Sequence, residues 1–195
     1  MRRLKEAHME AVTDIVAGSR WSRWRIVMWG TATFLLLLPA IAMQFTSEVD
    51  WDARDFVVMG AMLASACAVC ELAARASSNG AYRTAAGIAV GTALLTAWTN
   101  LAVGMIGSES NPYNLVFAGV LGIALVGAIV ARFEASGMAR AMIAAGLAQA
   151  AAGALGLTAD VRGALFSMGF SGLWLLSALT FRVAARQLAA SSKLV

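Results

Sequence analysis

The stretch IVMWGTATFLLLLPAIAMQF, residues 26–45, carries no charged side chain and decides the fold class. A helix needs ~20 mainly apolar residues to cross the ~30 Å hydrocarbon core of a bilayer. Five further stretches have the same character, at 56–74, 84–107, 113–131, 139–157 and 163–181. Because lipid offers the backbone no hydrogen-bond partner, such runs become helices. We therefore predict an all-α, polytopic membrane helical bundle with about six transmembrane helices.

The composition favours the same class. The chain has 195 residues, of which 60% are hydrophobic and 13% charged, whereas a soluble domain carries about 25% charged residues. The net charge of +4 does not indicate nucleic acid, because the basic residues are spread over loops between apolar runs. We expect membrane lipids as the surroundings and no nucleic-acid partner. We also expect no secretory signal peptide, because no convincing cleavage site follows the first apolar run.

The placement of Lys and Arg predicts the orientation. With six spans, one side of the membrane receives both chain ends and the loops at 75–83 and 132–140. That side holds 13 of the 15 basic residues, and only Arg54 and Arg162 lie on the other. Loops rich in Lys and Arg stay in the cytoplasm. We therefore predict a multi-pass membrane protein with cytoplasmic N- and C-termini.

Residues 3–20 read as an amphipathic helix ahead of the first span, with Leu4, Ala7, Ala11 and Ile15 on one face. Such a helix either lies on the inner leaflet or docks a cytosolic partner. His8 has no second ligand nearby, so no metal site is expected there. The domain prediction is a cytosolic or interfacial N-terminal helix at 1–25, the six-helix bundle at 26–181 and a cytosolic tail at 182–195.

Glu71 is the one carboxylate expected inside a span, one turn from the inner end of the second. A carboxylate there is costly unless it is paired or near water. Arg75 follows at i+4, the favourable order for a helical ion pair, and we predict that pair. The alternative is a protonatable or cation-binding group in a cavity. Cys67 and Cys70 lie on the same run and are interpreted as packing residues, because metal or redox chemistry would want further ligands.

Uncharged polar residues mark three other spans. Thr92, Thr96 and Asn100 recur every four residues in the third span, Gln149 lies in the fifth, and Ser167 and Ser171 in the sixth. Ser and Thr can bond to their own helix. The amides of Asn and Gln are expected to bond between helices, or else to line a solute path. The candidate intramembrane polar site consists of Glu71, Arg75, Thr96, Asn100 and Gln149.

Glycine is abundant in the spans. Gly87 and Gly91 form a GxxxG pattern, and Gly119 and Gly122 mark the fourth span. Small residues let helix backbones approach in lipid. We predict tight packing of these four glycines within the bundle. The alternative is that one glycine face joins two copies of the chain.

The two inner hairpins share the pattern R-x4-G-x2-R, at 75–83 and 132–140. The pattern indicates either a parallel repeat of two helix pairs or common turn chemistry, with Arg ending a helix and Gly capping it.

Residues 102–142, AVGMIGSESNPYNLVFAGVLGIALVGAIVARFEASGMARAM, carry a resemblance. The loop G-S-E-x-N-P followed by N-L, and the turn A-R-F…G-M-A-R, resemble the family of small, uncharacterised bacterial multi-pass inner-membrane proteins. The resemblance implies a bacterial membrane protein. It implies no activity and assigns no functional residue.

Catalytic signatures are absent from the sequence. It contains no H-E-x2-H, G-x-S-x-G or Walker loop, and no span holds a His for haem or a Lys for retinal. We expect no enzyme, no catalytic residue, no cofactor and no metal. The sequence favours association as an accessory, scaffold or regulatory subunit of a membrane complex or homo-oligomer. The alternatives are a small-solute or ion channel or transporter using Glu71, Asn100 and Gln149, and a cation sensor using the acidic loop at 48–55.

Overall fold

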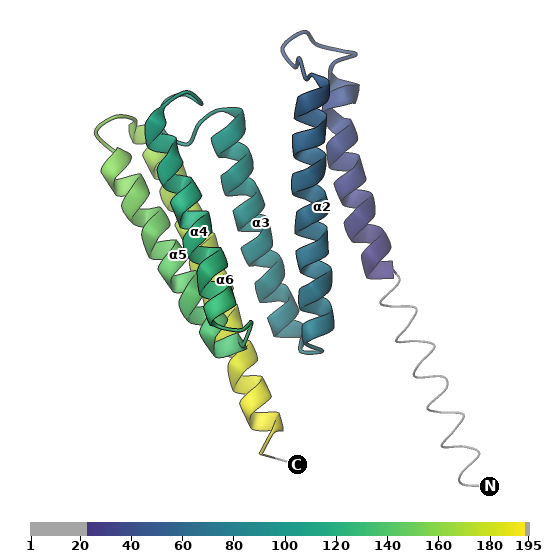
Figure 1. The fold of residues 1–195 in the computed structure, drawn as a ribbon, viewed down its shortest axis with the longest axis vertical. Helices are drawn as coiled ribbons and strands as arrows, with labels where there is room; N and C mark the ends of the chain where they lie inside the picture. The colour runs from purple at the N-terminus through teal and green to yellow at the C-terminus, as the bar shows by residue number, and fades with distance from the viewer. Residues whose placement is uncertain (1–22, 194–195) are drawn as a thin grey trace, which may run out of the picture. The chain divides into compact units, whose positions relative to one another are not determined.

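The computed structural model of this chain describes residues 23–193 (Figure 1). All regular secondary structure in that range is helical, and short loops and turns connect the helices. Its helices are Arg23–Ala42, α2 (Ala53–Ala76), α3 (Gly80–Ala102), α4 (Leu115–Val130), α5 (Ala135–Gly156) and α6 (Val161–Ser191), with a 3-10 turn at Pro112–Asn114. Counting that turn with α4, six helices of residues 23–193 are long and apolar enough to cross a membrane. The predicted class, a multi-pass membrane helical bundle, is confirmed. The expected N-terminal helix and His8 lie outside the described residues.

The chain divides into two compact units at Cys67, within α2. In the first, the helix Arg23–Ala42 and the first part of α2 form a hairpin. A Cβ placed at Gly60 would lie 3.6 Å from the side chain of Leu36, which is ordinary van der Waals contact. Asp52 precedes α2 and accepts the N–H groups of Arg54 and Asp55 on its Oδ1, while Asp55 Oδ2 accepts from Asp52 N–H. This reciprocal capping starts the helix.

The second unit is built around α6, which packs along both α5 and α3, while α4 packs on α5 (Figure 1). Its core has two apolar clusters. One, around Tyr82, Trp174 and Phe181, lies toward the end that carries the connections at 77–79 and 131–134, called here the arginine-rich end. The other, around Ile106 and Phe117, lies toward the opposite end. Ala and Gly dominate α5 because it is the span most enclosed by other helices.

Two predicted boundaries differ from the structure. The third span was expected to reach Gly107, but α3 ends at Ala102, because Gly104 and Gly107 have φ angles of +76° and +74° and turn the chain away. The sixth span was expected to end at Phe181, but α6 continues to Ser191 and has 31 residues. At 1.5 Å per residue α6 is ~46 Å long, which exceeds the ~30 Å hydrocarbon core.

The two inner hairpins, read from the sequence either as a repeat or as common turn chemistry, do not share one local structure. Gly80 is the first residue of α3, whereas Gly137 is the third residue of α5, so the two glycines hold different positions. Neither glycine caps a helix with a positive φ. The helix α4 instead ends with Arg132 and Phe133 at φ +49° and +60°. Phe133 N–H donates to Ala128 O and Arg132 N–H to Ile129 O, which is a Schellman ending built without glycine.

Candidate functional site

Glu71 and Arg75 form the predicted ion pair. Nη2 of Arg75 lies 3.3 Å from Oε2 of Glu71, one turn apart on α2. The Glu71 side chain is 11% exposed and that of Arg75 64%. The arginine therefore reaches from the open end of the helix to a nearly buried carboxylate. The two cysteines nearby are not joined in a disulfide, and Cys67 is buried and Cys70 half-buried.

Gln149 makes the interhelical bond expected of it. Its Nε2 donates to Oγ of Ser167 at 3.1 Å and joins α5 to α6. Both residues are 0% exposed. The helices approach closely here because Gly153 lies one turn further along α5. A Cβ placed at Gly153 would lie 2.9 Å from Cγ of Met168 and 3.0 Å from the carbonyl oxygen of Ala164.

Asn100 also bonds outside its own helix. Its Nδ2 donates to the carbonyl oxygen of Asn114 at 3.0 Å, which ties the end of α3 to the turn before α4. The side chain of Asn114 organises the loop between them. Its Oδ1 accepts the N–H groups of Met105 and Ile106, and its Nδ2 donates to Ser108 O at 2.7 Å. The prediction for Asn100 is confirmed, and Asn114 is a structural residue that the sequence reasoning missed.

Asp160 fastens the same loop to the start of α6. Its Oδ1 accepts from Gly163 N–H and its Oδ2 from Gly107 N–H, both at 3.0 Å. The N–H of Gly163, followed by that of Gly107, lowers the pKa of the Asp160 carboxyl below its usual value. The sequence analysis counted Asp160 only as an acidic loop residue. Its place directly before an apolar run was the available signal for a helix cap.

Thr92 and Thr96 of α3 differ in the hydrogen bonding of their hydroxyl groups. Thr92 donates its hydroxyl to Ile88 O at 2.7 Å, so it bonds to its own helix as predicted. Thr96 is 0% exposed, and its Oγ1 has no hydrogen-bond partner among residues 23–193. In the same described range three further buried atoms have none: Asn100 Oδ1, Gln149 Oε1 and Trp174 Nε1.

The candidate polar residues do not converge on one site. Glu71 and Arg75 lie in the last turns of α2, at the arginine-rich end. Asn100 lies near the far end of α3, 20 residues past Gly80 (100 minus 80), which is ~30 Å along the helix. Gln149 lies between these levels, on α5. Thr96 and Gln149 are both fully buried, whereas Glu71 and Asn100 lie at opposite ends of the second unit.

The four glycines predicted to pack within the bundle make no close contact inside the second unit. Within residues 68–193, no heavy atom lies within 4 Å of a Cβ placed at Gly87, Gly91, Gly119 or Gly122. Gly87 and Gly119 are exposed and the other two half-buried. The glycines at close approaches are others: Gly127 meets Ala141 at 2.7 Å, Gly146 meets Trp174 at 3.2 Å and Gly156 meets Ile106 at 2.8 Å. The spacing identified small residues but not the faces that the fold brings together.

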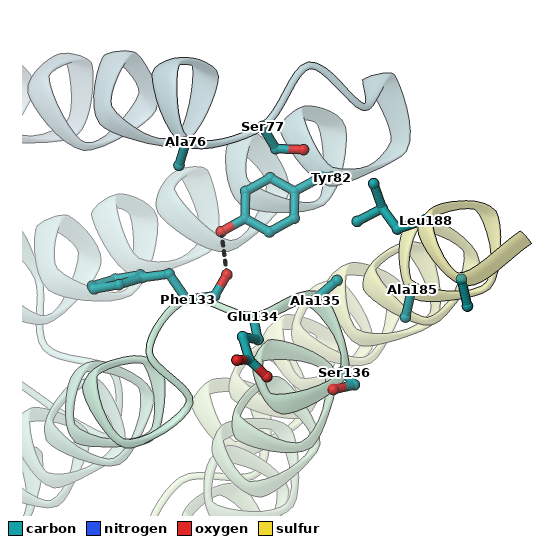
Figure 2. Close-up of a pocket in the computed structure, with 10 residues that line it drawn as sticks. Ala76, Ser77, Tyr82, Phe133, Glu134, Ala135, Ser136, Ala185 and Leu188 are labelled. Atoms are coloured by element: carbon teal, nitrogen blue, oxygen red, sulfur yellow. Dashed lines mark hydrogen bonds between the residues drawn. The ribbon is translucent and has the colours of Figure 1, made fainter. Parts of the chain in front are cut away.

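An open hollow of about 550 Å³ lies at the arginine-rich end, between the ends of α2, α5 and α6 (Figure 2). Ser77, Phe133, Glu134 and Leu188 line it. At its edge the hydroxyl of Tyr82 donates to Phe133 O at 2.7 Å, which holds the left-handed α4–α5 connection in place. No residue of the candidate polar site lines this hollow.

The acidic loop at 48–55 uses two of its carboxylates, Asp52 and Asp55, to cap α2. Over the part of the chain that the structure describes, no group of three or more His, Cys, Asp or Glu residues could hold a metal ion.

No family model matches this chain, and comparisons with the curated proteins and with the solved structures gave no match.

Proposed function

We propose that this multi-pass membrane protein acts by association, through self-assembly in which the GxxxG face of α3 joins two copies. The observation that carries the proposal is the open notch at Gly87 and Gly91. Within residues 68–193 no atom lies within 4 Å of a Cβ at either position. Helices in lipid associate by close van der Waals packing of small residues. An uncovered pair at i and i+4 is the pattern that such packing uses.

The surroundings of the notch support the same role. Leu95, on α3, and Leu101, near its end, are 46% and 60% exposed, so this helix presents both glycine notches and bulky side chains. A second helix can fit its ridges into such grooves. The proposed role is an accessory, scaffold or regulatory subunit of a membrane complex, without a catalytic step of its own.

The transport alternative has less support. A solute path needs its polar groups along one route, whereas Glu71 and Asn100 lie at opposite ends of the second unit. Glu71 is paired with Arg75, and Gln149 and Asn100 each use their amide N–H to tie elements together. These bonds account for three polar residues without a transported solute.

The proposed location is the bacterial inner membrane, with both chain ends in the cytoplasm. The placement of 13 of 15 basic residues on one side supports the orientation. The resemblance of residues 102–142 to bacterial inner-membrane proteins supports the membrane. Reporter fusions at the C-terminus and in the loop at 103–111 should report opposite sides, and the same side for both would contradict this layout.

Self-association is tested by mass measurement of the purified protein in lipid nanodiscs or native-like detergent. The wild type should be dimeric or larger, and Gly87→Leu with Gly91→Leu should be monomeric with unchanged helix content. Leu125→Phe is the matched control, because it enlarges a side chain that is 62% exposed on α4, away from the notch of α3, and it should leave the assembly intact. A wild type that is monomeric at every concentration would contradict the proposal.

A further inference from the structure

The C-terminal part of α6 extends beyond the helices around it (Figure 1). Oγ of Ser177 donates to Ala85 O at 2.8 Å and sets the levels of the antiparallel helices α6 and α3. Arg182 lies five residues after Ser177, and Gly80, the first residue of α3, lies five residues before Ala85. The two therefore stand at one level, and the nine residues 183–191 (191 minus 182) run ~13 Å past it.

In a bilayer this surplus length falls in the headgroup layer. The 23 residues of α3 span ~34 Å, which is enough to cross the ~30 Å hydrocarbon core. With its headgroups a bilayer is about 40–45 Å thick, and the whole of α6 is ~46 Å long. Because α6 begins at Val161, five residues after α5 ends at Gly156, the two helices are level at that end. The surplus therefore lies at the arginine-rich end.

Three basic side chains share one face of this projecting segment, defined here as residues 182–193. Arg186 follows Arg182 at i+4, and Lys193 follows it at i+11, which is about three turns. All three are exposed, and none forms an ion pair among residues 23–193. The last turn of α6 holds no basic residue, so the helix dipole, whose effect ends within that turn, does not account for the two arginines.

The projecting segment also carries aliphatic side chains beside its basic face. Val183 and Leu188 are 46% and 42% exposed. A helical segment with cations along one face and exposed aliphatic groups next to them fits the boundary between acyl chains and headgroups. The anions of that layer are lipid phosphates, which guanidinium groups bind with two parallel hydrogen bonds.

We propose that the projecting segment is a docking surface for anionic phospholipids. Arg182 and Arg186, one turn apart, pair with headgroup phosphates, and Lys193 adds attraction further from the hydrocarbon core. Charge complementarity carries the proposal, because the segment brings cations without acidic partners into the layer where the phosphates lie. Each basic residue near an anionic bilayer strengthens binding about five-fold. The surface is independent of self-association, because it uses no residue of the Gly87–Gly91 face.

Lipid retention tests the surface. The full chain is placed in nanodiscs of phosphatidylcholine and phosphatidylglycerol in equal amounts, and native mass spectrometry counts the lipids that stay bound after release. The wild type should retain phosphatidylglycerol in preference to phosphatidylcholine. Arg182→Gln with Arg186→Gln should lower that preference about five-fold or more. A wild type that retains the two lipids equally would overturn the proposal.

Arg132→Gln with Arg140→Gln is the matched control. It removes two exposed arginines from the same end of the second unit and changes the net charge equally. These two lie on the α4–α5 connection and on α5, eight residues apart, so they form no basic face. The control should keep most of the preference, and both variants should keep the helix content of the wild type. An equal loss in both variants would assign the preference to net charge and overturn the proposal.

Discussion

Glycines recur along both α5 and α3, but the glycines of the two helices have different neighbours. Gly146 and Gly153 on α5 lie where α6 approaches, and a Cβ at Gly153 would come within 3 Å of Met168. Gly87 and Gly91 on α3 meet no atom within 4 Å in residues 68–193. In lipid, small residues are selected for helix contact. One set of glycines therefore makes contacts inside the second unit, and the other set is the one that we propose for an external contact.

The largest difference in stability is expected when one glycine of each kind is replaced by leucine. Gly153→Leu should destabilise the bundle by ~3 kcal/mol or more, because the α5–α6 approach has no room for the side chain. Gly169→Leu on α6 is the control, since no atom lies within 4 Å of a Cβ there. Thermal unfolding of both variants in detergent measures the difference. Equal midpoints would mean that the α5–α6 contact is looser than described.

Gly104→Ala is expected to cause the next largest loss of stability. Gly104 has a φ of +76°, and a Cβ there would collide with the Ser108 backbone and lie 2.7 Å from Nδ2 of Asn114. The expected loss is about 2 kcal/mol, from strain and from the broken Asn114 network. Gly80→Ala, at a helical position with open space, should change the unfolding midpoint little. A loss as large in Gly80→Ala would assign the effect to glycine removal in general.

A pH titration of stability tests the Asp160 cap at the start of α6. The pKa of Asp160 is lowered in the folded protein by the N–H groups of Gly163 and Gly107. A carboxyl with a lowered folded pKa adds stability above its unfolded pKa, near 3.8, and loses it as the pH falls through the folded value. The wild type should therefore lose stability below about pH 4 more steeply than Asp160→Asn. Parallel pH profiles for the two proteins would contradict this.

Glu71→Gln should have the smallest effect, because it touches neither glycine set. Its partner Arg75 is 64% exposed, and a helical i,i+4 ion pair with one exposed partner contributes about 0.5 kcal/mol. The change in unfolding midpoint should be near the limit of detection. A large loss would show that the Glu71 carboxylate has a role beyond this ion pair.

Sequence reasoning predicted the class of fold because lipid imposes a length and a composition on every span. It also predicted that Glu71, Asn100 and Gln149 form bonds, since a polar group inside a span must find a partner. It did not find the glycines that make the close approaches of the second unit, Gly127, Gly146, Gly153 and Gly156, because spacing places glycines on a common face but does not say which helix meets it. It missed Asn114 and Asp160, whose roles depend on loop contacts with residues as many as 53 positions away along the chain.

The central claim, self-association through the Gly87–Gly91 face, is tested most directly by energy transfer between two differently labelled copies in lipid vesicles. Transfer in the wild type should persist as the protein is diluted in lipid and should follow a saturable dimer curve. It should fall to the random-collision level in the Gly87→Leu, Gly91→Leu protein and stay unchanged in Leu125→Phe, whose enlarged side chain lies on α4. Random-collision transfer in the wild type itself would contradict the claim.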